Sequence, residues 1–189
     1  MIVSRTPSRK LSALAALGIA LSSPAALAQQ PQQDWRAALP QVVQGIWIGG
    51  GTVATSRGQA EVVCEGAHSV QPGSFVRVIQ DFRCHPSSQA LAHGQPLMFA
   101  PFRFSVWSDT TDGATVQGSW WENGRTVGRF SGGMSAWPYP RLTATIQVQG
   151  DGGRAVSASY TSDEVSMTVS SPTPGISQMT LRLYRPEAR

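Results

Sequence analysis

The stretch ATVQGSWWENGRTVGRFSGG, residues 114–133, decides the fold. At its centre, Asn123-Gly124 is a pair that favours two-residue type I′ turns, because both positions need a positive φ that Gly adopts freely and Asn tolerates. Residues typical of strands flank the pair on both sides. The stretch therefore predicts a β-hairpin whose strands cover residues 114–122 and 125–133.

The same turn sets an expected register for the hairpin. Side chains in a strand alternate between two faces, so a two-residue turn determines which residues lie opposite one another. Adjacent tryptophans must then point to opposite faces, and one of them must face outward. We expect the hairpin to pair Trp121 with Thr126, Trp120 with Val127, and Gly118 with Arg129.

The hairpin belongs to a longer series of β-rich runs that begins at Gly45. These runs alternate with Gly, Asn, Asp and Pro at the spacing of a sandwich or barrel. In the fourth run, Phe102 and Phe104 share one side and Arg103 and Trp107 the other, as in a sheet with one buried face. We predict an all-β, antiparallel up-and-down barrel of eight to ten strands. The candidate strands are residues 45–53, 59–68, 75–84, 99–107, 114–122, 125–133, 141–148, 154–160, 164–170 and 177–185.

The first 28 residues have the features of a secretory signal peptide. Arg5, Arg9 and Lys10 precede an apolar run at residues 11–21, and Ala26-Leu27-Ala28 forms a small-residue cleavage motif. The run is much shorter than the roughly 20 apolar residues that span a bilayer, so a retained anchor is the weaker interpretation. We expect cleavage after residue 28, no transmembrane anchor afterwards, and a periplasmic or secreted location.

Cleavage changes the charge of the chain. The full chain has a formal net charge of +4, but the leader holds three of the fifteen basic residues, which leaves twelve against eleven acidic ones, or about +1. The remaining arginines are scattered, whereas a nucleic-acid or anionic-membrane surface needs a clustered basic patch. We therefore expect no nucleic-acid partner.

The mature chain contains two cysteines, Cys64 and Cys84. Disulfides persist in exported proteins, and both cysteines fall on strand faces that they share with apolar residues. A redox or metal pair is the alternative, but it would favour Cys-x-x-Cys spacing or nearby histidines. We predict a structural disulfide between these two residues.

A polar segment and one short helix precede the barrel. Residues 29–33 read QQPQQ and have nothing to bury, so we expect them to be disordered. Asp34 can cap a helix from Trp35 to Leu39, which Pro40 is expected to end. The predicted organisation is a signal peptide at 1–28, a disordered linker and short helix at 29–42, and a single β-barrel domain at 43–189.

The segment Gly45-Ile46-Trp47 resembles the G-x-W motif of the lipocalin family and its calycin relatives. In those proteins a short N-terminal helix leads into this motif on the first strand. The resemblance implies a lipocalin-like barrel, and an arginine near the end of the last strand that packs over the tryptophan. Arg185 stands at that place, so the resemblance implies a cation–π contact between Arg185 and Trp47.

A second resemblance covers most of the mature domain. Small uncharacterised secreted proteins of α-proteobacteria share a pattern of W-x-G-x-G, a cysteine pair, G-x-W-x-E and G-x-x-x-G. The corresponding residues are Trp47–Gly51, Cys64 with Cys84, Gly118–Glu122, and Gly128 with Gly132. Around Trp47 the pattern departs, because an additional glycine follows. This resemblance implies a fold and a compartment but no activity.

The sequence contains no catalytic or metal-binding motif that we could identify. His68, His85 and His93 form no H-x-H or H-E-x-x-H pair, so we interpret each as an ordinary loop or strand-edge residue. The segment Gly128–Gly132 places its serine one position late for the G-x-S-x-G motif of hydrolases. We therefore expect a protein that is not an enzyme, with no catalytic residues, no metal and no cofactor.

The segment Trp137-Pro138-Tyr139-Pro140 is the most suggestive loop. Two prolines stiffen a loop that carries two large rings, a combination suited to stacking on a sugar or an apolar ligand. The alternative is a loop that simply folds over the open end of a barrel.

These features favour an exported, noncatalytic binding module that holds a small apolar ligand in or at the mouth of the barrel. The candidate ligand-binding residues are all aromatic: Trp47, Phe102, Phe104, Trp120, Trp137 and Tyr139. The alternative is an envelope interaction or structural protein, for example one resembling a protease inhibitor, that acts through exposed loops. A contiguous patch of outward aromatics would favour this alternative, and the candidates are Trp107, Trp121, Trp137 and Tyr139.

Overall fold

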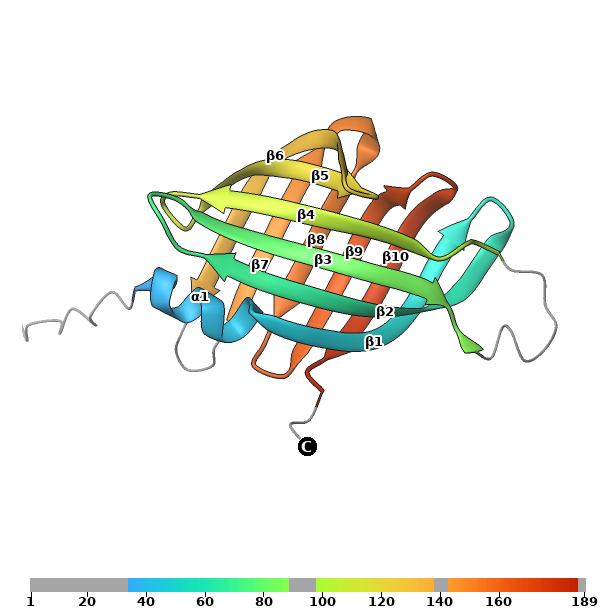
Figure 1. Ribbon diagram of the computed structural model, residues 1–189, viewed down its shortest axis with the longest axis horizontal. Coiled ribbons are helices and arrows are strands. Elements are labelled where there is room, and N and C mark those ends of the chain that lie inside the picture. Colours follow the sequence, from blue (N-terminus) through green and yellow to red (C-terminus); the bar gives the residue numbers. More distant parts are fainter. Residues whose placement is uncertain (1–33, 89–97, 138–142, 187–189) are drawn as a thin grey trace, which may run out of the picture. The chain divides into compact units, whose positions relative to one another are not determined.

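The computed structural model describes residues 34–88, 98–137 and 143–186. In this part of the chain one α-helix precedes ten strands and a 3-10 turn (Figure 1). The predicted signal peptide and residues 29–33 lie outside the described residues. The elements are α1 Trp35–Val43, β1 Gly45–Thr55, β2 Gly58–Gln71, β3 Val76–Pro86, β4 Phe102–Thr110, β5 Thr115–Glu122, β6 Arg125–Trp137, β7 Thr143–Gly150, η1 Asp151–Gly153, β8 Ala155–Tyr160, β9 Glu164–Thr173 and β10 Ile176–Tyr184.

The ten strands close into an antiparallel up-and-down barrel. Each strand pairs with its neighbours in sequence, and β1 also pairs with β10, so the closed sheet has no free edge. The predicted fold class is confirmed, with the strand number at the upper end of the predicted range. Every predicted strand coincides with an observed one, and their ends differ by at most four residues.

The central hairpin forms as predicted at its turn. Asn123 has a φ of 49° and Gly124 a φ of 78°, which is the signature of a type I′ turn. Trp121 lies opposite Thr126, as expected. The local turn chemistry therefore determined both the position of the hairpin and its first cross-strand pairs.

Beyond the turn, the predicted register is wrong by one residue. A bulge at Val127 lies opposite the step between Trp120 and Trp121, so Trp120 pairs with Gly128 instead of Val127, and Gly118 pairs with Phe130. The unbulged register would have pointed Arg129 into the barrel, at a large desolvation cost. The bulge instead buries Phe130 and leaves Arg129 exposed. The free energy gained by burying Phe130 thus outweighs that of a regular hydrogen-bond ladder between β5 and β6.

Helix α1 extends past the residue that was expected to end it. Asp34 caps the helix as predicted, because its carboxylate accepts a hydrogen bond of 3.0 Å from the backbone N–H of Arg36. Pro40, however, lies inside the helix, which continues to Val43. A proline inside a helix costs about 3 kcal/mol. Complete burial of Val42 and Val43 is worth about 1.5–3 kcal/mol for each side chain and offsets that cost.

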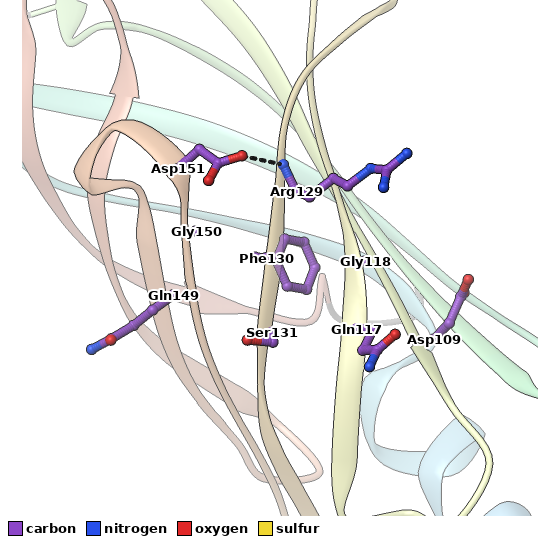
Figure 2. A pocket seen from close by; sticks show the side chains of 9 residues that line it. All are labelled: Asp109, Gln117, Gly118, Arg129, Phe130, Ser131, Gln149, Gly150 and Asp151. Atoms are coloured by element: carbon purple, nitrogen blue, oxygen red, sulfur yellow. Dashed lines mark hydrogen bonds between the residues drawn. The ribbon is translucent and has the colours of Figure 1, made fainter.

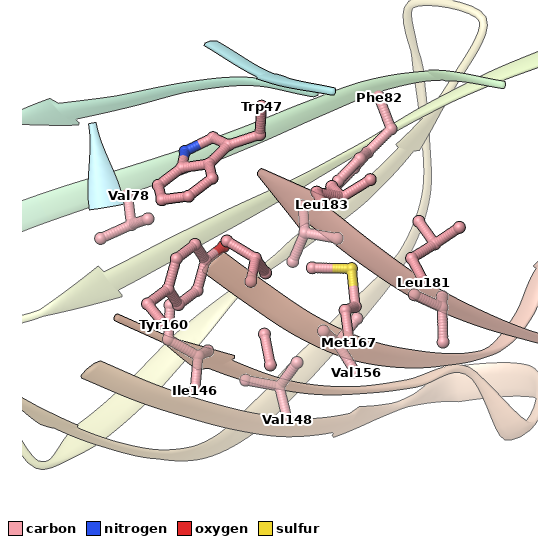
Figure 3. Packing of buried hydrophobic residues seen from close by; sticks show 14 of the residues in the cluster. Trp47, Val78, Phe82, Ile146, Val148, Val156, Tyr160, Met167, Leu181 and Leu183 are labelled. Carbon is pink, nitrogen blue, oxygen red and sulfur yellow. The ribbon is translucent and has the colours of Figure 1, made fainter. Parts of the chain in front are cut away.

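All ten strands contribute side chains to one continuous hydrophobic cluster inside the barrel. Figure 3 shows Trp47 and Tyr160 facing each other there, with Phe82, Met167 and Leu183 beside them. On β1, Gly51 permits the close approach of β10, because a Cβ at that position would lie 1.8 Å from the carbonyl oxygen of Thr180. The barrel is therefore closed by tight backbone packing and filled by apolar side chains.

The predicted disulfide is confirmed. Cys64 on β2 and Cys84 on β3 lie directly opposite each other in the ladder and are bonded. Both are buried. In the chain-entropy model, closing a loop of this length contributes about 3 kcal/mol. The bond fits an oxidising compartment, where disulfides persist.

Candidate functional site

Aromatic rings form a continuous column along the interior of the barrel, from one end to the other. Neighbouring ring centroids lie between 4.7 and 6.1 Å apart, within the usual range for aromatic pairs. We call this set the aromatic column, and in order it comprises Phe99, Phe102, Phe104 with Trp120, Phe82, His68, Tyr160 and Trp47.

The column begins at a hollow that we call the mouth. The mouth has a volume of about 310 Å³ and lies at the end of the barrel where β1 ends and β2 begins. Its walls come from the β1–β2 turn, the β9–β10 turn and the segment before β4. Phe99 and Phe102 meet there edge to face, with centroids 5.9 Å apart, and both are half-buried. The mouth is lined by Thr55, Ser56, Arg57, Met98, Phe99, Ala100, Pro101, Phe102, Asn123, Thr173, Pro174, Gly175 and Ile176.

Helix α1 lies at the opposite end of the barrel, where it contacts β2, β6 and β7 (Figure 1). The indole Nε1 of Trp47 donates a hydrogen bond of 3.0 Å to the carbonyl of Val43. The Arg185 guanidinium lies 4.5 Å above the Trp47 ring, and one of its nitrogens donates to the carbonyls of Gln41 and Val42. The expected contact between Arg185 and Trp47 is confirmed, and it fastens α1 to the barrel.

A buried polar cluster, formed by His68, Gln80 and Tyr160, interrupts the column near α1. The Gln80 amide donates a hydrogen bond to the Tyr160 hydroxyl, which lies 3.3 Å from Nδ1 of His68. Because burial raises the pKa of Tyr160, its hydroxyl stays protonated and can donate to that nitrogen. The proton of the neutral imidazole then resides on Nε2, which has no hydrogen-bond partner, and neither does Oε1 of Gln80.

The imidazole of His68 is held neutral by its surroundings. Burial lowers its pKa from 6.5 to about 3, the charge of Asp81 raises it in part, and the charge of Arg185 lowers it further. Protonation of Nδ1 would also remove the acceptor that the Tyr160 hydroxyl uses. The interpretation of His68 as a loop or strand-edge residue is therefore wrong, because it lies on β2 and is only 4% exposed.

No sequence motif predicted this cluster, although one signal was present. In β3, Gln80 occupies an inward position between Val78 and Phe82, where the alternation calls for an apolar side chain. An inward glutamine in such a run needs a buried polar partner. Neither His68 nor Tyr160 could be chosen as that partner without the pairing of strands around the barrel.

The predicted ligand-binding residues divide into two groups and an undescribed remainder. Trp47, Phe104 and Trp120 are at most 2% exposed and belong to the filled interior. Phe102 lies at the mouth. The side chain of Trp137 and the whole of Tyr139 lie outside the described residues.

The outer wall of the barrel carries a second set of features. Trp107 on β4 and Trp121 on β5 point outward, as predicted, and stack with centroids 4.7 Å apart. A polar hollow of about 770 Å³ crosses β4 to β7 beside them, and Figure 2 shows the Asp151 carboxylate at its edge, bonded to the backbone N–H of Arg129. This hollow is lined by Asp109, Gln117, Gly118, Arg129, Phe130, Ser131, Gln149, Gly150 and Asp151.

Two absences hold for residues 34–88, 98–137 and 143–186. Within these ranges, no three His, Cys, Asp or Glu side chains lie together in a way that could hold a metal ion. The helix in these ranges is too short and too polar to cross a membrane.

Comparison with known proteins supports the fold. No model of a known protein family and no curated protein sequence matches the chain. Among solved structures, the crystal structure of Rv2717c from M. tuberculosis is similar, with a TM-score of 0.55 and 14% sequence identity over 82% of this chain and 98% of that one. At this identity the similarity shows a shared small β-barrel fold and nothing more.

Proposed function

We propose that the protein is an exported, noncatalytic binding module that holds a small apolar ligand at the mouth of its barrel. The observation that carries this proposal is the mouth itself, a hollow of about 310 Å³ at the accessible end of the aromatic column. Its volume is at the lower end of the range for small-molecule sites, which favours a small ligand.

The filled interior supports the mouth over the barrel centre as the binding place. Trp47 and Phe104 are fully buried, and apolar side chains from every strand surround them. A ligand among them would have to displace packed side chains, each worth about 1.5–3 kcal/mol of burial. Phe102 is different, since it is half-buried and lines the mouth. In this proposal Phe99 and Phe102 contact the ligand, and the deeper rings hold them in place.

Two features support export. The leader has a basic start, a short apolar run and a small-residue cleavage motif. The disulfide between Cys64 and Cys84 belongs to an oxidising compartment. A periplasmic or secreted location accounts for both features.

Titration of the purified protein with the fluorescent apolar probe N-phenyl-1-naphthylamine tests the proposal. Phe99→Ala removes one wall of the mouth and should weaken probe binding about five- to thirty-fold, because about 1–2 kcal/mol of apolar contact is lost. Tyr184→Ala is the matched control, since Tyr184 is an aromatic residue 46% exposed on β10 near the α1 end. Equal probe affinities for both variants and the parent protein, or no probe binding at all, would exclude the mouth as the site.

The alternative function, an envelope interaction protein, depends on a contiguous patch of outward aromatics. Trp107 and Trp121 do lie together, whereas the side chain of Trp137 and the whole of Tyr139 lie outside the described residues.

A further inference from the structure

The stacked pair Trp107 and Trp121 lies on the outer wall of the barrel, between two hollows. We propose that this part of the outer wall, formed by β3 to β7, binds a neutral oligosaccharide, one sugar ring of which packs against Trp121 on the side away from Trp107. The Trp107 ring lies between Trp121 and the Arg77 guanidinium and supports the Trp121 ring. This site shares Asn123 with the mouth but does not depend on the apolar ligand proposed there.

The indole pair is held rigidly. Nε1 of Trp121 donates a hydrogen bond of 2.8 Å to the Ser119 hydroxyl. The Arg77 guanidinium lies 5.3 Å from the Trp107 ring and is itself fixed by two bonds of 2.7 and 2.8 Å to Asp109. Because these rings are already ordered, binding of a ligand against them costs little protein side-chain entropy.

A hollow of about 520 Å³ lies on the mouth side of the pair and offers polar groups beside the rings. Nε of Arg103 donates a bond of 3.0 Å to Asp81, and the Ser105 hydroxyl donates one of 2.9 Å to the same carboxylate. The guanidinium has further N–H groups for a ligand, and the amide of Asn123 lies on the rim. An apolar ring surface beside fixed, planar hydrogen-bonding groups suits a sugar, which has an apolar C–H face and a rim of hydroxyls.

The second hollow, of about 770 Å³, continues the surface on the other side of the pair (Figure 2). The strand register places Asp109, Gln117, Ser131 and Gln149 in one row across β4 to β7. Trp107 lies in the next row toward the mouth, opposite Ser119, and Trp121 lies one row further. A ligand with several sugar units, extended across these rows, could therefore use both hollows at once.

The charges on this surface favour a neutral ligand. Arg77 is paired with Asp109 and Arg103 with Asp81, so the two guanidinium groups are offset by two carboxylates. A nucleic acid or another polyanion would need an excess of basic groups. Arg129 and Asp151 add one charge of each sign to the larger hollow. The neutral hydroxyl and amide groups of the two hollows come from Ser105, Gln117, Asn123, Ser131 and Gln149. The row from Asp109 to Gln149 runs across four neighbouring strands, which favours β-1,4-linked chains because these are extended.

Isothermal titration of the purified protein with cellopentaose and chitopentaose tests this site. At least one of the two probes should bind, Trp121→Ala should weaken its binding about tenfold or more, and Trp121→Phe should retain most of the affinity. The matched control Tyr184→Ala removes an exposed aromatic on β10 and should bind as the parent protein does. Circular dichroism of each variant confirms that the barrel is intact.

Several outcomes would overturn the proposal. The first is that neither probe binds up to about 5 mM, and the second is that Trp121→Ala and the parent protein bind the sugar with equal affinity. The third is that the wall captures a protein from periplasmic extract, that Trp121→Ala abolishes this capture, and that no sugar binds. The Phe99→Ala variant separates this site from the mouth. Its sugar affinity should equal that of the parent protein whether or not the apolar probe binds.

Discussion

The neutral buried imidazole of His68 should make the barrel less stable in mildly acidic solution. The folded pKa of about 3 lies below the unfolded value of 6.5, so the stabilising effect of the neutral state is complete above pH 6.5 and is lost as the pH falls toward 3. Linkage between these two values predicts a loss of about 2 kcal/mol between pH 7 and pH 5. At pH values well below 3, the total loss of stability caused by this residue approaches about 5 kcal/mol.

The window from pH 7 to pH 5 isolates this residue from the shifted carboxyl groups. For Asp81, burial raises the pKa, but hydrogen bonds from Arg103 and Ser105 outweigh burial and leave it below 3.8. Backbone N–H groups of Ala114 and Thr115 lower the pKa of Asp112 to about 2. Both carboxylates stabilise the fold above pH 3.8 and lose that effect only as the pH falls below it, which is outside the chosen window.

Urea denaturation of His68→Gln beside the parent protein measures the effect. Glutamine keeps a polar group near Tyr160 but cannot take up a proton, so the loss between pH 7 and pH 5 should shrink by about 2 kcal/mol. Contributions of other titratable groups are common to both proteins and cancel in the difference. If His68→Gln loses as much stability as the parent protein over this window, the neutral imidazole is not the cause. Imidazole ¹⁵N shifts of His68 that change near pH 6 would refute it independently.

Three further predictions concern the framework of the barrel. Replacement of both cysteines by alanine should lower the free energy of unfolding by about 3 kcal/mol in urea titrations, and equal stability would contradict a structural disulfide. Gly51→Ala should abolish or severely weaken the pairing of β1 with β10, because its Cβ would lie 1.8 Å from a carbonyl oxygen. Gly153→Ala is the comparison, because a Cβ there would have no atom within 4 Å and the variant should lose only the stability that its φ of 74° costs. Thermal melts compare these two variants. Arg185→Ala should cost about 2 kcal/mol and raise amide hydrogen exchange in α1 more than in β4, since it removes two hydrogen bonds to the helix and the contact with Trp47.

The strands and the disulfide could be predicted because their signals are local. The pair Asn123-Gly124 specifies its own turn through backbone conformation, whatever surrounds it. The alternation around Phe102 and Phe104 likewise reports one buried face for each strand, but it says nothing about which strands are neighbours. Local signals therefore gave ten strands in chain order, and the simplest antiparallel closure of that order is the barrel that is observed.

The errors arose where tertiary burial overrides a local rule. Pro40 should end a helix, but the burial of Val42 and Val43 carries α1 onward. The regular hairpin register is broken by a bulge, because Phe130 gains by burial inside the barrel, whereas burial of the Arg129 charge would carry a large desolvation cost. In each case the outcome depends on whether a side chain is buried after the barrel has closed. A short segment of sequence does not contain that information.

The polar cluster inside the barrel shows the same limit and has a consequence for function. His68 and Gln80 lie opposite each other on the neighbouring strands β2 and β3, whereas Tyr160 is 92 residues from His68 and meets them only across the closed interior. Their unpartnered atoms cost stability, since each buried polar group without a hydrogen bond costs about 1–3 kcal/mol. An apolar replacement would fit the surrounding aromatic column better, so stability alone does not account for the cluster. If the sole role of the column were to support Phe102 at the mouth, an apolar core variant such as His68→Leu with Gln80→Leu should bind the apolar probe as tightly as the parent protein. A loss of probe affinity in a fully folded variant of this kind would instead show that the polar cluster and the mouth are coupled through the rings between them.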